Sequence, residues 1–284
     1  NRIRLPRPCG AHSQMTASPD RPRARPPDRL VPGCSGPINA LVVGAGGGIG
    51  SAIASLLAAR SDVATLFLAS RITPEPVPAG ALLSPRSARL HPVACDLTAP
   101  ETLEALRAEI AATVGRLHLV INAAGVLHDD GLAPEKTVRQ IDPQAMAKSF
   151  AVNATGVALL ARALWPLLVH EEPTVFASLS ARVGSIGDNR LGGWYAYRAS
   201  KAAHNQLLRT FAIELARSNP RAIVLALHPG TVDTALSRPY QGGVRPGQIL
   251  TPAESAAWLT SILADRTPAD TGGFFAWDGQ RVPW

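Results

Sequence analysis

Residues 38–57 read INALVVGAGGGIGSAIASLL: an apolar run, a glycine-rich turn, and a stretch with apolar residues at helical spacing. A second apolar run, VATLFLA, follows at 63–69. Short apolar runs bounded by turn residues are typical of buried strands, and apolar spacings of three and four residues are typical of a helix. This part of the chain therefore predicts a strand, a tight turn, a helix and a second strand.

The same alternation continues along the chain. Segments long enough for a helix separate most of the further apolar runs, which lie at 89–95, 117–121, 174–179 and 221–227, with a last candidate edge strand at 272–277 and a Pro-rich loop at 73–85. Strands that alternate with helices favour a parallel sheet covered by helices on both faces. We therefore expect an α/β protein, a single Rossmann domain with a doubly wound parallel sheet, over residues 38–284.

Residues 1–37 have a different composition, with eight prolines, seven arginines, two acidic residues and almost no apolar periodicity. This composition predicts a disordered N-terminal extension. An arginine-rich, acid-poor leader also resembles an organelle transit peptide, although so many prolines oppose the amphipathic helix that such peptides need. We expect a cytoplasmic protein, with an organellar location as the alternative.

Net charge and hydropathy bear on possible partners. The formal net charge is +7, but the N-terminal extension carries +5 of it, and the remaining chain has 21 basic and 19 acidic residues. A nearly neutral domain lacks the basic face that binds nucleic acid. No stretch approaches 18 uninterrupted apolar residues, so the sequence predicts neither a nucleic-acid partner nor a membrane span.

The cysteines and histidines show no metal or disulfide pattern. The three cysteines, Cys9, Cys34 and Cys95, give no paired framework, which suits a reducing compartment. The seven histidines are scattered without ligand spacing, and the sequence HDD at 128–130 is better interpreted as a solvated turn than as a metal site. We therefore expect no metal.

The glycine turn after the first strand is the first candidate binding site. Gly44, Gly48 and Gly50 follow a strand directly and open a helix, and this context makes a glycine motif informative. Without Cβ atoms, the backbone can turn sharply, approach a pyrophosphate and present helix N-terminal N–H groups to it. The turn, which also includes Gly47 and Ile49, therefore predicts a bound dinucleotide.

The end of the second strand indicates which dinucleotide is preferred. An acidic residue there would accept hydrogen bonds from the ribose diol of NAD, but the sequence has Ser70 and Arg71 instead. A hydroxyl and a guanidinium suit a 2′-phosphate, and no carboxylate is present to repel it. We therefore expect NADP(H) in preference to NAD(H); the alternative is an exposed arginine without a ligand.

The stretch WYAYRASK at 194–201 contains two tyrosines and a lysine. On a helix, residues four apart share a face, so Tyr197 can meet Lys201 while Tyr195 cannot. Acid–base work by a phenol near neutral pH requires a pKa shift of roughly three units, on the order of 4 kcal/mol. A nearby ammonium and an oxidised nicotinamide both favour the phenolate, so Tyr197 and Lys201 are the candidate proton-transfer pair.

With the glycine turn, the Tyr-x-x-x-Lys pair and the strand order, residues 38–284 resemble the short-chain dehydrogenase/reductase family. Asp96 and Leu97 are similar to its adenine-contacting pair, and Asn153 matches the helix asparagine of its proton relay. The remaining matches are the N-A-A-G run Asn122, Ala123, Ala124 and Gly125, and a nicotinamide loop with Pro229, Gly230, Val232 and Thr234. Several motifs in the family's order make chance agreement improbable.

The runs SARVGSIGDNRLGGWYAYRASKAA, HPGTVDT and FFAWDGQRVPW resemble a subgroup of small carbonyl reductases related to the bacterial C-factor and the fly sniffer protein. The resemblance implies hydride transfer between NADP(H) and a small-molecule carbonyl or alcohol. Tyr197 would be the acid/base, Lys201 would bind the nicotinamide ribose, and Asn153 would support a water-mediated relay. It also implies a homo-oligomer paired through the helices that hold Asn153 and Tyr197.

One position departs from the family pattern. The serine that orients the substrate carbonyl normally stands three residues before a glycine, and counting back from Gly184 gives Ala181. Ser180 is one residue earlier, where a regular strand would turn its hydroxyl to the other face, and Ser185 is the other candidate. We choose Ser180 because it lies at the predicted strand end. If neither hydroxyl reaches the site, the chain would be a weakly active or inactive NADP(H)-binding sensor.

Overall fold

The computed structural model describes residues 26–72, 88–245 and 247–284. Its central feature is a seven-stranded sheet in the order β3-β2-β1-β4-β5-β6-β9, with every neighbouring pair parallel. The strands are β1 (Ile38–Val43), β2 (Val63–Ser70), β3 (Arg89–Ala94), β4 (Leu119–Asn122), β5 (Thr174–Leu179), β6 (Ala222–His228) and β9 (Gly273–Ala276). The predicted Rossmann fold is confirmed, and the run at 272–277 forms an edge strand as predicted.

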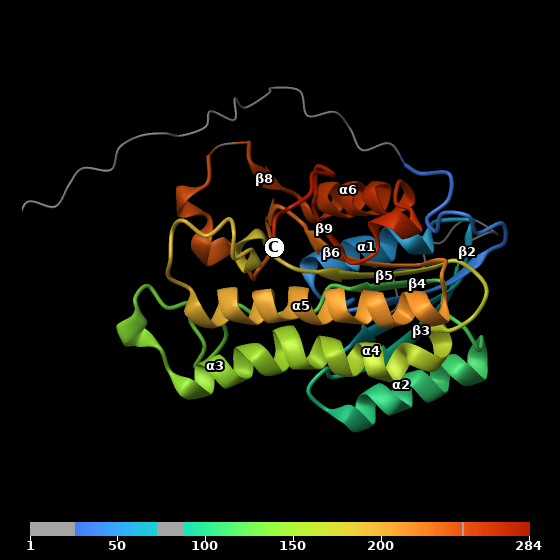
Figure 1. The fold of residues 1–284 in the computed structure, drawn as a ribbon, viewed down its shortest axis with the longest axis horizontal. Coiled ribbons are helices and arrows are strands. Elements are labelled where there is room, and N and C mark those ends of the chain that lie inside the picture. Colours follow the sequence, from blue (N-terminus) through green and yellow to red (C-terminus); the bar gives the residue numbers. More distant parts are fainter. Residues whose placement is uncertain (1–25, 73–87, 246) are drawn as a thin grey trace, which may run out of the picture.

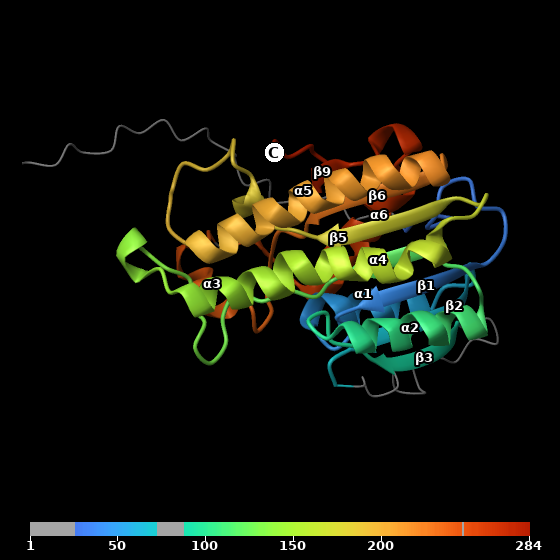
Figure 2. The same ribbon diagram turned by 60° about the horizontal axis from the view of Figure 1, so that its bottom comes forward.

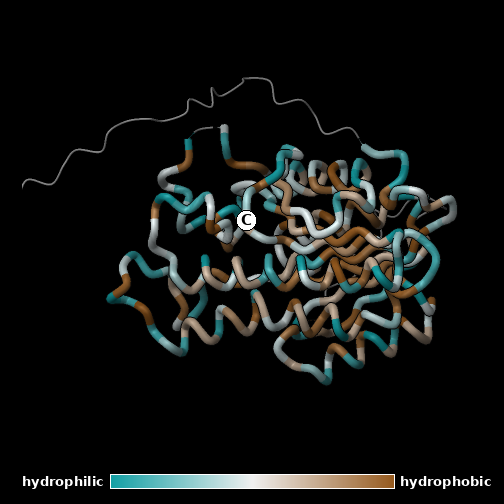
Figure 3. The backbone as a smooth tube through the Cα atoms, in the orientation of Figure 1, coloured by the Kyte–Doolittle hydropathy of each residue, from teal (hydrophilic) through white to brown (hydrophobic). Residues whose placement is uncertain are grey.

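Helices cover both faces of this sheet, as Figures 1 and 2 show. One layer contains α1 (Gly48–Ala58) and α6 (Pro252–Ala264). The other contains α2 (Pro100–Thr113), α4 (Gly156–Leu168) and α5 (Tyr195–Ser218), and α3 (Pro143–Phe150) leads into α4. Each layer has its own buried apolar core against the sheet, and Figure 3 shows the apolar chain concentrated at the centre.

Smaller elements connect these layers. Between α3 and α4, residues Ala151–Thr155 form one π-helical turn, so the helix bulges where Asn153 lies. A two-stranded ribbon pairs β7 (Thr231–Val232) with β8 (Ile249–Leu250), and short 3-10 turns occupy Val138–Gln140, Arg182–Gly184, Arg238–Gly243 and Pro268–Asp270. The predicted loop at 73–85 lies outside the described residues.

The helical stretch from α3 through α4 is long and apolar enough, by length and composition, to cross a membrane. It is the one such helix among the described residues, and 56% of its most apolar window is buried inside the fold. Burial against the sheet accounts for its apolar character, as expected for the core helix of an α/β domain.

The chain just before β1 differs from expectation. Leu30 and Val31 are 0% and 1% exposed, and they belong to the core on the α1–α6 face of the sheet. The backbone N–H of Leu30 donates to the Asp62 carboxylate at 3.2 Å, and Arg221 donates to the carbonyl of Gly33 at 3.2 Å. The prediction of disorder up to residue 37 is therefore wrong for this segment, while residues 1–25 lie outside the described residues.

Candidate active site

The glycine turn has the close backbone approach that its sequence predicts. Gly44 follows β1 with φ +81°, a left-handed conformation that favours glycine. A Cβ at Gly44 would lie 2.7 Å from the backbone nitrogen of Ala124, and a Cβ at Gly50 would lie 2.0 Å from the carbonyl oxygen of Gly44. These positions admit no side chain, so the turn lies directly against the loop that follows β4.

The N-terminus of α1 is open to an anion. Its N-cap, Gly47, offers no side-chain hydrogen bond, and no acidic residue lies in the first turn. The first N–H groups of a helix without a cap can donate to a phosphate, and the helix dipole favours negative charge there. A Cβ at Gly48 would lie 2.6 Å from Cγ2 of Thr234, which places the loop after β7 directly beside Gly48 and Ile49. These residues fit a dinucleotide pyrophosphate.

The side chains predicted to hold the adenosine half lie at the ends of β2 and β3. A Cβ at Gly46 would lie 3.5 Å from Oγ of Ser70, whose hydroxyl donates to the carbonyl of Ile72. Arg71 is exposed. The pKa of Asp96 lies below its ordinary value, mainly because its carboxylate accepts hydrogen bonds from the Thr98 N–H and hydroxyl, and the Arg71 charge contributes.

Leu97, predicted beside Asp96, is buried in the core. It is 5% exposed, and a Cβ at Gly156 would lie 2.7 Å from its Cβ. Its side chain therefore packs under α4, so only its backbone remains for a ligand.

The N-A-A-G loop after β4 joins the glycine turn to α5. The Asn122 side chain donates to the Ser178 hydroxyl at 2.9 Å and accepts from the N–H of Ala124 at 3.1 Å. These bonds hold the chain in a tight turn through Ala123. A Cβ at Gly125 would lie 3.5 Å from Nζ of Lys201, so the loop brings the expected cofactor site next to the predicted lysine.

Tyr197 and Lys201 lie one turn apart near the start of α5, with Nζ 6.0 Å from the centroid of the phenol ring. Lys201 is 3% exposed, and its Nζ donates to the carbonyl of Leu179 at the end of β5, at 2.8 Å. Burial lowers the pKa of Lys201 to about 8. The strand end therefore anchors an ammonium that gives up its proton more readily than an exposed lysine does.

The phenol itself shows the opposite effect. Burial raises the pKa of Tyr197 above its ordinary value, and no lowering by Lys201 offsets this. The predicted contribution of Lys201 to lowering this pKa therefore finds no support in the free chain. A group that favours phenolate has to come from elsewhere, and a positively charged cofactor ring is of that kind.

Asn153 lies on the π-helical turn, and the backbone of Val126 holds its side chain in place. Its side chain donates to the carbonyl of Val126 at 2.8 Å and accepts from the N–H of Val126 at 2.9 Å. Its backbone carbonyl accepts from Nδ1 of His204 at 3.0 Å. His204 is completely buried, and burial, followed by the Lys201 charge, holds its pKa well below the ordinary value. No sequence motif singles out this histidine, although it lies three residues after Lys201 on the same helix.

The Ser180 hydroxyl already has a hydrogen-bond partner on α5. Its hydroxyl donates to Oδ1 of Asn205 on α5 at 2.6 Å, and both residues are at least 96% buried. Ser185 is 1% exposed and accepts from the N–H of Asp188 at 3.1 Å. Ala181, between them, is half-buried with an extended backbone. The contact with Asn205 gives Ser180 a structural partner, which weakens its choice as the residue that orients a carbonyl.

The loop predicted to contact the nicotinamide is held by Leu250, Ser255 and Trp277. Gly230 has φ +83°, and a Cβ there would lie 2.9 Å from both Leu250 and Trp277. The carbonyl of Pro229 accepts from the Ser255 hydroxyl at 3.0 Å, and Val232 is 3% exposed within β7. This segment is therefore fixed at the carboxyl end of β6, where it faces the glycine turn.

A cysteine, a histidine and a glutamate gather at the opposite end of the sheet, where Cys34, His118 and Glu172 bring their donor atoms within 4.8 Å of one another. Nδ1 of His118 lies 3.1 Å from the N–H of Asn39 and accepts from it, so the ring proton is on Nε2, which donates to Glu172 at 2.7 Å. Binding a metal through Nε2 would require an imidazolate. This cluster is therefore a poor metal site.

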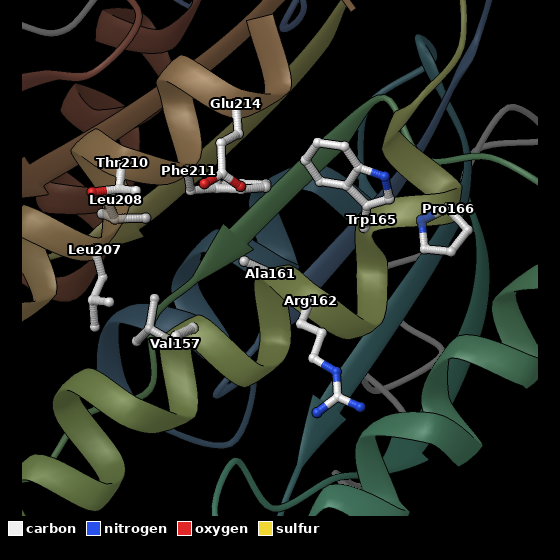
Figure 4. A pocket seen from close by; sticks show the side chains of 11 residues that line it. Val157, Ala161, Arg162, Trp165, Pro166, Leu207, Leu208, Thr210, Phe211 and Glu214 are labelled. Atoms are coloured by element: carbon white, nitrogen blue, oxygen red, sulfur yellow. The ribbon is translucent and has the colours of Figure 1, made fainter. Parts of the chain in front are cut away.

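A groove between α4 and α5 is lined by apolar side chains from both helices, including Val157, Trp165, Leu207 and Phe211, as Figure 4 shows. The predicted site residues do not line it. Trp165 packs here against Phe211, with ring centroids 6.2 Å apart.

A family model described as short chain dehydrogenase matches residues 39–243. A 1-hydroxy-2-glutathionyl-2-methyl-3-butene dehydrogenase from Rhodococcus sp. is 32% identical over 86% of this chain and 98% of the relative. The C-signal protein of Myxococcus xanthus is 33% identical over 60% of this chain and 94% of its own length.

Among solved structures, the NADPH-bound carbonyl reductase from chicken fatty liver superposes with a TM-score of 0.74 at 26% identity, covering 88% of this chain and all of that one. The resemblance to small carbonyl reductases is thereby confirmed. The matched range spans most of the chain and includes the glycine turn, the Asn122 loop and the Tyr197–Lys201 helix. The chain belongs to the short-chain dehydrogenase/reductase family of oxidoreductases.

Proposed function

We propose that this oxidoreductase interconverts a carbonyl and an alcohol with NADP(H), using Tyr197 as the acid/base. The observation that carries the proposal is the placement of the Tyr197 phenol and the Lys201 ammonium on one face of α5, beside the loop at Gly125. NADPH, when bound, supplies a hydride to the carbonyl carbon. A relative in the comparison is named as a dehydrogenase of a hydroxylated glutathione conjugate, which is consistent with alcohol–carbonyl chemistry.

Tyr197, Lys201 and Asn153 each have a distinct task in this proposal. Tyr197 donates its phenolic proton to the substrate oxygen as negative charge develops there. Lys201, fixed on the Leu179 carbonyl, stabilises the resulting phenolate and holds the nicotinamide ribose. With a pKa of about 8, it can release a proton toward the phenolate near neutral pH. Asn153 fixes the helix bulge on which the relay rests.

The orienting hydrogen bond to the substrate oxygen is the open part of the site. Ser180 was the first candidate, but its hydroxyl donates to Asn205, so we propose that Ser185 is the better candidate among the two serines. Ser185 uses its oxygen as an acceptor toward Asp188, which leaves its proton available.

The decisive experiment compares two neighbouring tyrosines. Purified protein is mixed with NADPH and a panel of aldehydes and ketones, and the loss of nicotinamide absorbance is followed. Tyr197→Phe should lower kcat at least a hundredfold, since general acid catalysis contributes roughly 10²–10⁴. Tyr195→Phe is the matched control, because Tyr195 is 37% exposed two residues away and should keep its activity. Equal activity of both variants contradicts the proposal.

The preference for NADP(H) rests on Ser70 and Arg71 at the end of β2. A guanidinium beside a 2′-phosphate gains a charge-assisted hydrogen bond that the ribose diol of NAD does not offer. Arg71→Ala should raise KM for NADPH about tenfold while KM for NADH changes little, and Arg190→Ala is the control with another exposed arginine. An unchanged KM ratio would show that Arg71 does not select the cofactor.

A second candidate function is an NADP(H)-binding sensor with little or no turnover. The observation that favours it is Ala181, which removes the family's serine from the end of β5. Binding of NADPH in titration calorimetry, together with no turnover of any carbonyl in the panel, would support the sensor over the enzyme.

We propose further that two copies of the chain pair through α4 and α5. The apolar groove between these helices, with Leu207 36% exposed, is the surface that such pairing would cover. Light scattering of the purified protein tests the pairing.

We also propose a cytoplasmic location, because Cys34 and Cys95 are free thiols.

A further inference from the structure

Three aromatic rings from three separate segments continue outward from the Tyr197 phenol. Trp194, from the chain before α5, lies with its ring centroid 6.2 Å from that of Tyr197, at an interplanar angle of 70°. Tyr240, from the turn between β7 and β8, lies 5.2 Å from Trp194 at 67°. His128, from the chain after β4, lies 5.6 Å from Tyr240 at 63°. We call Trp194, Tyr240 and His128 the aromatic wall.

The aromatic wall stands at the catalytic end of the molecule. In Figures 1 and 2, the green segment after β4, the yellow segment before α5 and the orange segment between β7 and β8 gather at the left end. All strands of the main sheet are parallel, so this end lies beyond their carboxyl ends, where open α/β sheets bind their ligands. The rings of the wall are half-buried, unlike the core rings of Phe67 and Phe176, which are fully buried.

The backbone at Trp194 is held in an unfavourable conformation. With φ +53°, it is the one residue other than glycine with positive φ among residues 26–72, 88–245 and 247–284. Its N–H donates to the carbonyl of Glu135 at 2.5 Å, and the buried Glu135 carboxylate accepts from the N–H of Ala196 at 3.2 Å. Strain that neighbouring contacts enforce is concentrated at functional sites. Here these contacts turn the indole toward the phenol.

The segments that carry the wall also expose large apolar side chains: Val138 (61%), Ile141 (36%), Ile186 (78%), Leu191 (91%) and Leu236 (36%). Exposed apolar side chains on the segments beside a site favour an apolar ligand.

We propose that the substrate is a carbonyl compound, or the corresponding alcohol, that carries an aromatic ring, and that the aromatic wall selects this ring. Trp194 is the main specificity-determining residue, because it contacts both the catalytic phenol and Tyr240. Edge-to-face and offset contacts between aromatic rings add attraction beyond simple apolar burial. A saturated ring of the same size is buried equally but does not gain this added attraction. The inference rests on the proposed carbonyl–alcohol activity of Tyr197.

The test uses two ketones that differ only in the ring. Phenyl methyl ketone and cyclohexyl methyl ketone are reduced with NADPH, and the ratio of their kcat/KM values is measured for four proteins. The unaltered chain should prefer the phenyl compound about tenfold or more, and Trp194→Ala should reduce this ratio about three- to tenfold. Trp194→Phe keeps a ring and should retain most of the preference. Tyr195→Ala is the matched control and should leave the ratio unchanged.

Two results would overturn the inference: equal kcat/KM values for the two ketones, or a loss in Trp194→Ala that is the same for both. Circular dichroism of each variant excludes a general folding defect. If neither ketone turns over, the proposed activity fails, and binding then decides the inference separately. Titration calorimetry of the NADP-saturated chain with 1-phenylethanol and 1-cyclohexylethanol should give tighter binding of the phenyl alcohol, dependent on Trp194; equal affinities sink the proposal.

Discussion

The hydroxyl of Ser180 donates to the side-chain carbonyl of Asn205 at 2.6 Å, so the residue that follows β5 is tied to the middle of α5. Asn205 also donates to the carbonyl of Gly184 at 3.5 Å. The pair therefore holds together the strand end, the following turn and the helix that carries Tyr197 and Lys201. These bonds stabilise the backbone around the candidate site. The position between Ser180 and the turn, residue 181, is an alanine and offers no hydroxyl.

Introducing the family's hydroxyl should strengthen catalysis. We expect Ala181→Ser to raise kcat for carbonyl reduction roughly tenfold or more, because one added hydrogen-bond donor to a developing oxyanion has a large effect. Steady-state kinetics with NADPH measures the change, and Ala181→Val, which adds bulk without a hydroxyl, is the control. A serine variant that is no faster than the unaltered chain would mean that position 181 does not face the substrate oxygen.

Removing the hydroxyl of Ser180 should affect stability rather than turnover. Ser180→Ala leaves the buried Oδ1 of Asn205 without its donor, which should lower the free energy of unfolding by about 1–3 kcal/mol. The double variant Ser180→Ala with Asn205→Leu removes both polar partners and should recover part of this loss. Urea unfolding measures both effects. A large drop in kcat with unchanged stability would restore Ser180 as a catalytic residue.

The glycine turn offers a matched pair of substitutions. A Cβ at Gly50 would lie 2.0 Å from the Gly44 carbonyl oxygen, whereas a Cβ at Gly47 would lie 3.4 Å from the same atom. Gly50→Ala should therefore destabilise the fold by about 1–3 kcal/mol through overpacking and weaken NADPH binding. Gly47→Ala should have a much smaller effect on both. Thermal unfolding and cofactor titration compare them, and equal behaviour would contradict the close approach.

Stability should fall in mildly acidic solution because histidines are buried in their neutral form. Burial lowers the pKa of His228 to about 4, with a smaller contribution from Arg182, and it holds that of His204 well below the ordinary 6.5. The unfolded chain then binds more protons than the folded one. The stability of the neutral burial is complete above about pH 6.5 and is lost as the pH falls toward 4.

Each such histidine should contribute a slope on the order of 1 kcal/mol per pH unit in this window. Urea unfolding at pH 7 and pH 5 measures the slope. His228→Asn should reduce the number of protons taken up on unfolding by about one, and the slope should fall accordingly. A free energy of unfolding that is the same at both values would rule out buried neutral histidines.

Local rules predicted the features that depend on local geometry. The spacing of Tyr197 and Lys201 determines that they share a helix face, and the alternation of apolar runs determines a parallel sheet. The side of the sheet that Ser180 faces depends on where β5 ends and on Asn205, which lies 25 residues further along the chain. Only the folded chain shows that pairing.

The missed features have the same explanation. His204 occupies a buried position on α5, and its hydrogen-bond partner is the backbone carbonyl of Asn153 in the π-helical turn. No residue pattern in the sequence predicts that turn. Leu30 and Val31 are two apolar residues in a proline-rich composition, so their burial could not be distinguished from an unstructured leader. Tertiary contacts decide such positions, and averaged composition hides them.

The packed segment before β1 matters to anyone who shortens this protein for crystallisation or assay. A version that begins at Ile38 would expose the apolar surface that Leu30 and Val31 cover, and would leave Arg221 without its carbonyl acceptor at Gly33. Trimming should stop before Asp28, whose own carbonyl accepts a hydrogen bond from Arg60. An unstable or aggregating short version would then reflect the loss of the packed segment before β1 and not a defect of the catalytic domain.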